Sequence, residues 1–229
     1  MDTPASKLKN GDLVLFSILM GCKPKGRNVE QHDVFFGVAR HIDELTEDLK
    51  SFWYKTIVGE LGEAVKRSIP GADTAALKDD LLKSLSRRDK VHIDAWTKVQ
   101  YADGYKVSVQ LKSASPAEHG QKLYFINLGG YKENEFEEYH KKLFIVAASV
   151  SEAMEKIMHH EFMKEYSPSD LGIAGSAHLD DQYKIDFEAD DVVCVSEAIG
   201  DHYTLALEKV ESHPADEMVV GYTHINYPD

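Results

Sequence analysis

The sequence contains one segment twice. Residues 15–39 and 123–147 align without a gap at a constant offset of 108, and eight of their 25 positions are identical. The identical pairs are Leu15/Leu123, Ile18/Ile126, Gly21/Gly129, Glu30/Glu138, His32/His140, Phe36/Phe144, Val38/Val146 and Ala39/Ala147. Self-similarity at a fixed offset indicates an internal duplication. We therefore expect the 229 residues to fold as two units of about 100 residues each.

Each copy shows the same order of predicted elements. Apolar spacing predicts two strands joined by a polar loop, then a helix, then two further strands. In the first copy these are residues 13–20, 33–40, a helix from about Asp43, 91–96 and 98–111. In the second they are 122–128, 142–148, a helix after Ser149, 177–187 and 202–210. This order is that of the β-grasp fold, so the predicted fold class is α+β with two tandem β-grasp-like ββαββ repeats.

Two stretches lie outside this common plan. Residues 58–90 have no counterpart in the second copy, and a break at Pro70-Gly71 before a leucine stripe predicts a helical insert. Residues 211–229 are expected to be an extension packed against one copy or a loose tail. We therefore place the first repeat at 1–112 with its insert and the second repeat at 121–229 with its C-terminal extension, joined by a polar linker.

Four polar positions recur in both copies. A Glu-x-His pair leads into the second strand, and a His-x-Asp pair lies on the third. They are Glu30, His32, His92 and Asp94 in the first copy, and Glu138, His140, His178 and Asp180 in the second. Side chains two residues apart share one face of a strand. If the strands are neighbours, two histidines and two carboxylates therefore converge in each copy.

This cluster has two interpretations. Imidazole and carboxylate groups can bind a metal ion or transfer protons. They can also hydrogen-bond across the strand ends and pin the hairpin to the later strand. We favour the second interpretation, because His32 is in phase with the apolar side chains of its strand and is expected to be partly buried; these are Val34, Phe36 and Val38. Accordingly, we assign no metal, no cofactor and no catalytic residue.

The net charge of −13 is carried by the second half of the chain. Residues 1–120 hold 18 basic and 17 acidic side chains, whereas residues 121–229 hold 8 and 22. Nucleic-acid binding rests on contacts between cations and phosphates, so we expect no nucleic-acid partner. No apolar run reaches the roughly 20 residues of a membrane span, no signal core is present, and the two cysteines form no disulfide framework. We therefore expect a cytoplasmic protein that does not bind membranes.

Several strings resemble a bacterial family described as domain of unknown function 1543. They are LYFINLGG, EEYHKKLFIVA and AHLDD, with the earlier forms LFSILMG, VEQHDVFFGVA and VHIDAW. The family occurs as one or two copies per chain, and its pattern includes E-x-H-D, H-[IV]-D-D and a final G-Y strand. The second copy departs from the pattern at Lys141, and the first at Ala95. The resemblance implies the fold class and a bacterial cytoplasmic setting, and it implies no activity.

We predict a non-enzymatic binding or interaction module, with a basic protein or a small ligand as its partner. The alternative is a metal-dependent or histidine-using enzyme built on the Glu/His/His/Asp cluster. The sequence holds no nucleophile elbow and no phosphate-binding loop that would decide between them. It therefore leaves open whether the chain is an enzyme.

Overall fold

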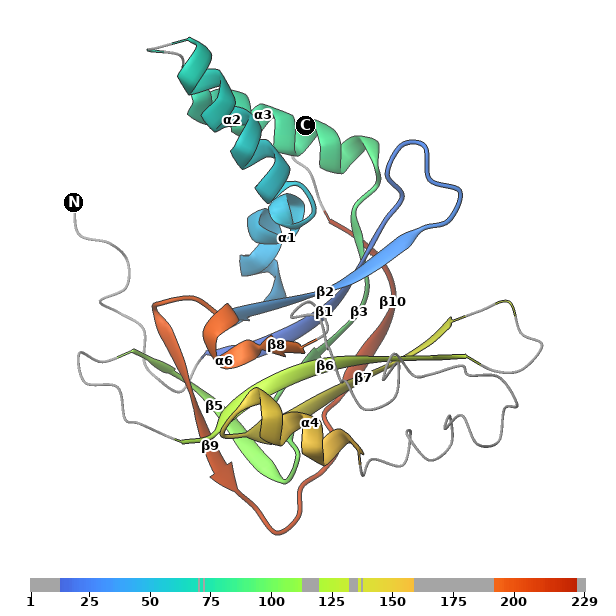
Figure 1. Cartoon of the computed structure of the whole chain (residues 1–229), viewed down its shortest axis with the longest axis vertical. Coiled ribbons are helices and arrows are strands. Elements are labelled where there is room, and N and C mark those ends of the chain that lie inside the picture. Colours follow the sequence, from blue (N-terminus) through green and yellow to red (C-terminus); the bar gives the residue numbers. More distant parts are fainter. Residues whose placement is uncertain are drawn as a thin grey trace. The chain divides into compact units, whose positions relative to one another are not determined.

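The computed structural model describes residues 13–69, 71, 73–112, 120–131, 136, 138–158 and 192–225 (Figure 1). The chain divides into two compact units that do not follow its sequence order. The first comprises the residues up to Val99 together with those from Asp216 onward, and the second comprises Gln100–Ala215. The chain therefore leaves the first unit after Val99 and returns to it near its end.

The first unit is built on a four-stranded antiparallel sheet. Its strands are β1 (Val14–Cys22), β2 (Gln31–Ala39), β3 (His92–Lys98) and β10 (Met218–His224), in the order β10-β3-β1-β2. One face of β1 is fully buried in the core through Phe16, Ile18, Met20 and Cys22. Because side chains alternate along a strand, Gly21 lies on the opposite face.

Helices cover the core face of this sheet. After β2 come the 3-10 turn η2 (Ile42–Leu45), α1 (Thr46–Phe52), α2 (Lys55–Ser68) and α3 (Thr74–Arg88). Their buried contributions to the core are Leu45, Leu49, Tyr54 and Val58. The single helix predicted from Asp43 is thus interrupted at Trp53-Tyr54. The predicted insert is helical, although its first helix begins at Lys55 rather than at residue 58.

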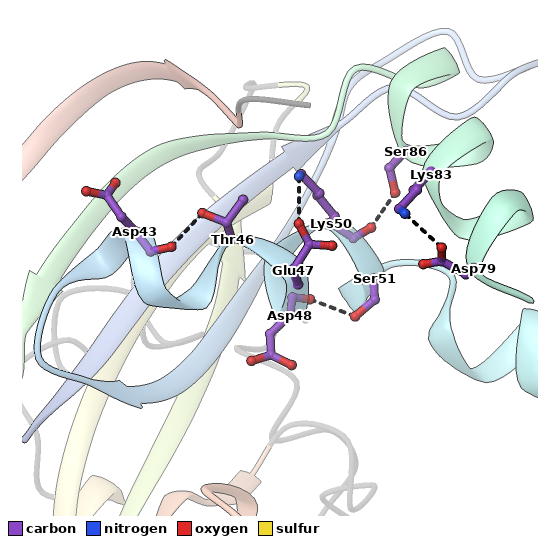
Figure 2. A network of polar contacts seen from close by, with 9 residues as sticks. All are labelled: Asp43, Thr46, Glu47, Asp48, Lys50, Ser51, Asp79, Lys83 and Ser86. Atoms are coloured by element: carbon purple, nitrogen blue, oxygen red, sulfur yellow. Dashed lines mark hydrogen bonds and ion pairs between the residues drawn. The ribbon is translucent and has the colours of Figure 1, made fainter. Parts of the chain in front are cut away.

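Polar contacts join and stabilise these helices (Figure 2). The Ser86 hydroxyl of α3 donates to the backbone carbonyl of Lys50 in α1. Within α1, the Lys50 ammonium lies 2.8 Å from the Glu47 carboxylate, and within α3 Lys83 lies 2.7 Å from Asp79. The Ser86 bond is the one of these that links two helices, so it fixes α3 against α1.

A buried polar group anchors α3 to the end of β1. The Asp89 carboxylate accepts two hydrogen bonds of 2.7 Å from the Arg88 guanidinium and one of 2.5 Å from the Tyr54 hydroxyl. The Arg88 bonds hold the pKa of Asp89 below its usual range, whereas burial raises the pKa of Tyr54 and of the neighbouring Cys22 thiol. Both oxygens of this buried carboxylate are therefore hydrogen-bonded.

The second unit, where described, contains two three-stranded antiparallel sheets. One has the order β7-β6-β8, with β6 (Lys122–Tyr131), β7 (Glu138–Ala147) and β8 (Val192–Cys194). The other has the order β4-β5-β9, with β4 (Tyr101–Ala102), β5 (Tyr105–Leu111) and β9 (Tyr203–Lys209). Helices α4 (Val150–Met158) and α6 (Val195–Ala198) follow β7 and β8. The predicted capping box begins α4, because the Ser149 hydroxyl accepts the N–H of Glu152 at 3.2 Å.

The two hairpins that carry the repeated segment pair in the same register. Gly21 pairs with His32 in the first hairpin, and Gly129 pairs with His140 in the second, 108 residues later. All nine pairs of the first hairpin recur in the second at this offset. Strand β8 also pairs with β6 on the side on which β3 pairs with β1.

The mixed α+β fold class is confirmed, but the β-grasp-like repeats are not confirmed as contiguous units. Strand β5, predicted to close the first repeat, pairs with β9 in the second unit. The predicted C-terminal extension instead supplies β10 to the first unit. The compact units therefore do not follow the predicted boundaries at residues 112 and 121. The stretch 177–187, predicted as a strand of the second copy, lies outside the described residues. None of the described helices combines the length and apolar character needed to cross a membrane.

Candidate functional site

Three neighbouring strands bring the four polar residues of the first copy together. Gly21 of β1 pairs with His32 of β2 on one side and with His92 of β3 on the other. Paired residues share one face of a sheet. Both histidines therefore lie on the face of β1 that carries Gly21, opposite the helix-packed core.

Both carboxylates contact both imidazoles. Asp94 lies 3.2 Å from Nε2 of His32 through Oδ2 and 3.2 Å from Nε2 of His92 through Oδ1. Glu30 lies 3.3 Å from Nε2 of His92 and 3.8 Å from Nε2 of His32. The four side chains thus form a closed ring of contacts in which histidine and carboxylate alternate. We call it the His–carboxylate ring.

The ring has a buried end and an exposed end. The side chain of His92 is 2% exposed and that of Asp94 is 25% exposed, whereas Glu30 and His32 are 40% and 45% exposed. A group that enters from solvent therefore meets Glu30 and His32 first. His92 forms the buried floor.

The side chain of His32 is 45% exposed and lies on the face of β2 that the helices do not cover. Phe35 and Ala39 are the β2 residues that pack in the helix-covered core. His32 consequently points away from the helices, together with the alternating residues Val34, Phe36 and Val38. Asp33, which belongs to the pattern of the resembled family, pairs with Met20 and so lies on the core side rather than in the ring.

A backbone carbonyl accepts a hydrogen bond from the ring of His92. Its Nδ1 lies 2.6 Å from the carbonyl oxygen of Lys90, and because a carbonyl can only accept, Nδ1 carries the proton. Lys90 has a φ of +54°, an uncommon left-handed conformation for a residue other than glycine. Nε2 is thereby directed at the two carboxylates. Neither this atom nor Oδ2 of Asp94, both buried, has a hydrogen-bond partner in the part of the chain that the structure describes.

Gly21 leaves the space that the ring occupies. A Cβ atom on this residue would lie 2.4 Å from Nε2 of His92 and 2.6 Å from Oδ2 of Asp94, well inside van der Waals contact. Only glycine therefore lets these two side chains lie across β1. This requirement gives a physical reason for the glycine at position 21, eleven residues before His32.

Strand irregularities direct two further side chains. Asp94 is an extra residue in β3 where the pairing with β1 shifts, and β10 has two residues opposite it, Gly221 and Tyr222. Such bulges redirect side chains and are frequent beside functional sites. Here the Tyr222 ring lies over the His92 ring, with 4.0 Å between centroids and 31° between planes.

Sequence reasoning missed three residues at this site. The repeat reveals Gly21, but the role of Gly21 depends on which side chains lie across it. Tyr222 and His224 belong to the predicted extension, and β10 pairs His224 with His92. The β-branched residues of 218–224 favour a strand, yet nothing local identifies β3 as its partner.

The residues of the second copy are described only in part. His140 lies on β7 in the register of His32, and Glu138 begins β7, whereas Glu30 directly precedes β2. His140 Nδ1 lies 3.0 Å from the side-chain amide of Asn127. His178 and Asp180 lie outside the described residues, so a ring of four is seen in the first unit alone.

As placed, the ring is not a preformed metal centre. Across the described ranges, no three or more His, Cys, Asp or Glu side chains are arranged to hold a metal ion. Each carboxylate spans the two imidazoles with different oxygens, so the donor atoms do not share one central position. The ring instead places negative charge around a fixed, buried imidazole nitrogen.

Comparisons with known proteins bear on the fold and on one segment. The family model described as Domain of Unknown Function (DUF1543) matches residues 27–59, which include Glu30 and His32 but not His92 or Asp94. A solved structure, described as "Crystal structure of a protein Il1583 from Idiomarina loihiensis", is similar with a TM-score of 0.52 and 19% identity, covering 95% of this chain and 100% of that one. This likeness concerns the fold alone. A comparison with curated proteins gives no match.

Proposed function

We propose that the chain is a binding module and that the His–carboxylate ring is its binding site for a small cation. The observation that carries the proposal is the buried Nε2 atom of His92, which faces two carboxylates without a hydrogen bond in the described structure. Buried polar atoms normally find partners. An unpaired one in a ring of charged groups points to a group that the protein binds.

The charge of the ring favours a cation. When both imidazoles are neutral, Glu30 and Asp94 leave the ring with two negative charges. The Lys90 carbonyl fixes the proton of neutral His92 on Nδ1, so the lone pair of Nε2 faces these carboxylates. A lone pair and a carboxylate repel each other at 3.2 Å. A proton on Nε2, or a metal ion among these groups, would turn the contacts into attractions.

The first unit also contains a structural polar cluster for comparison. There, Asp89 is 2% exposed and its two oxygens accept three hydrogen bonds from Arg88 and Tyr54. A cluster that only stabilises the fold would be expected to resemble this one. The ring differs because Nε2 of its most buried member, His92, makes no hydrogen bond in the described structure, although two carboxylates lie near it.

A histidine-using enzyme is the second candidate. His32 is 45% exposed and lies 3.2 Å from Asp94, which is the arrangement of a general base oriented by a carboxylate. Hydrolysis of p-nitrophenyl acetate or p-nitrophenyl phosphate by the wild-type chain tests this candidate. Loss of that hydrolysis in His32→Gln, with an unchanged unfolding temperature, would favour the enzyme over the binding module.

Thermal unfolding of the full chain tests the binding proposal. The probes are zinc chloride, manganese chloride and spermidine, and the variants are Asp94→Asn and its matched control Asp33→Asn, which removes the same charge on the other face of the sheet. A probe at 100 times its Kd stabilises the folded state by about 2.7 kcal/mol. We expect at least one probe to stabilise the wild type and Asp33→Asn but not Asp94→Asn. Equal responses of all three proteins to every probe would refute the proposal.

The proposal includes an origin by duplication. It is supported by the common offset of 108 and by the identical pairing of the two hairpins. We interpret the chain as two tandem β-grasp-like copies. In this interpretation β10 pairs with β3 at the edge of the first sheet, and β5 pairs with β9 in another sheet. A bacterial cytoplasmic setting, and a basic protein partner for the acidic residues of 121–229, remain parts of this proposal.

A further inference from the structure

The geometry points to a divalent transition metal of the zinc class as the cation that the ring binds. The inference rests on the proposed function, and it departs from the expectation, drawn from the sequence, that the chain holds no metal. The ligands are Nε2 of His32, Nε2 of His92 and one oxygen each of Glu30 and Asp94.

The types of donor atom select this class of ion. Calcium and magnesium are bound by oxygen atoms, whereas imidazole nitrogen suits zinc and its neighbours in the first transition row. The ring offers two imidazoles as well as two carboxylates. His92 is 2% exposed beneath the Tyr222 ring, so a single ion reaches its Nε2 more readily than the head group of an organic cation does.

The surroundings of His92 match those of a metal ligand. Histidines that bind metals usually donate their second ring N–H to a carbonyl or carboxylate, which fixes the ring and leaves the other nitrogen unprotonated. The 2.6 Å contact from Nδ1 of His92 to the Lys90 carbonyl is such a bond. The positive φ of Lys90 gives that carbonyl its direction.

The spacing of the donors requires a limited rearrangement. Neighbouring ligand atoms in a tetrahedral site with bonds of about 2.1 Å lie about 3.4 Å apart. The four contacts of the ring lie in a similar range, 3.2 to 3.8 Å, although each carboxylate reaches the two imidazoles through different oxygens. What is missing is a shared centre for the lone pairs, which is why no metal centre is preformed in the described part of the chain. Glu30 and His32, the two most exposed members, can rotate toward a centre defined by His92 and Asp94.

Calorimetric titration of the full, chelator-stripped chain with zinc chloride tests the inference. The chain has 11 histidines, so weak surface binding is expected as a background, and the variants decide. His32→Ala removes an exposed ligand and should weaken the strongest site at least about tenfold. Asp94→Asn should do the same without removing side-chain volume. The control His41→Ala should bind zinc as the wild type does, because His41 is exposed at the other end of β2 and makes no side-chain capping bond.

Each other outcome overturns the inference. Equal zinc affinity in the wild type, His32→Ala and Asp94→Asn would show adventitious surface binding only. A second outcome is that spermidine stabilises the wild type but not Asp94→Asn, while zinc binds the wild type and His32→Ala equally. That result would overturn the inference of a metal ion and leave the proposed cation site standing. If no cation gives any response, both the metal inference and the proposed function are overturned. Circular dichroism of each variant establishes that it is folded before it is titrated.

Discussion

Replacing Gly21 with alanine tests whether the ring lies where the structure places it. The new Cβ would lie 2.4 Å from Nε2 of His92, 2.6 Å from Oδ2 of Asp94 and 2.8 Å from Cε1 of His92. Non-bonded carbon atoms are most stable at about 3.5–4.0 Å, so one side chain or the strand must move by roughly 1 Å. His92 is buried and bonded to Lys90, so it has little freedom to yield.

The expected cost follows from two opposing effects. Overpacking a filled site typically costs about 1–3 kcal/mol. Replacing a strand glycine with alanine recovers roughly 0.5–1 kcal/mol of conformational entropy. From the middle of each range, we expect Gly21→Ala to lower the free energy of unfolding by about 1 kcal/mol, measured by urea denaturation.

Gly59→Ala is the matched control. Gly59 lies in α2, and a Cβ there would meet nothing within 4 Å. The same substitution should therefore stabilise the fold by about 0.5–1 kcal/mol, because alanine favours helix over glycine. If Gly21→Ala proves as stable as the wild type, His92 and Asp94 do not lie across Gly21 and the ring is misplaced.

Three further predictions concern the buried cluster at the end of α3. Tyr54→Phe should lower the free energy of unfolding by about 1–3 kcal/mol in urea denaturation, because the Asp89 carboxylate loses a donor; an unchanged midpoint would contradict this role. The Arg88 hydrogen bonds lower the folded-state pKa of Asp89, so its contribution is present above its ordinary value of 3.8 and is lost as the pH falls through the lowered pKa. Asp89→Asn should accordingly flatten the acid limb of a plot of stability against pH, and a limb as steep as that of the wild type would refute the assignment. Burial raises the pKa of the Cys22 thiol, so a thiol reagent at pH 8 should label Cys22 only after unfolding, as read by mass spectrometry of the peptides; rapid labelling of the folded chain would show that Cys22 is accessible.

Local sequence patterns predicted the two hairpins and picked out the four polar residues that the structure brings together in the first copy. The repeat placed the glycine and histidine of each hairpin at the same spacing, and both hairpins pair in one register. A two-residue period placed His92 and Asp94 on one face of β3; Asp94 contacts His32 of β2, and His92 contacts Glu30, directly before β2. These features depend on alternation along single strands, which the sequence contains directly.

The face on which His32 lies could not be derived in the same way. Both faces of β2 carry large apolar side chains, Val34 and Phe36 on one and Phe35 on the other. Alternation alone therefore does not identify the face that the helices cover. The structure assigns the helices to the face of Phe35, which leaves His32 exposed.

The redistribution of the last strands was also beyond the reach of sequence patterns. Strands β5 and β10 each have a strand-forming composition, but strand composition does not specify a partner. The pairs that decide the fold join β5 to β9 and β3 to β10, far apart along the chain. Tyr222 and His224 reach the ring only through the second of these pairings.

An anomalous difference map from crystals of the full chain grown with zinc would locate the ion directly. We expect a peak about 2.0–2.2 Å from Nε2 of both His32 and His92. Oxygens of Glu30 and Asp94 should lie within bonding distance of the same peak. Peaks at other histidines alone, with His92 still facing the two carboxylates and no ion between them, would contradict this expectation.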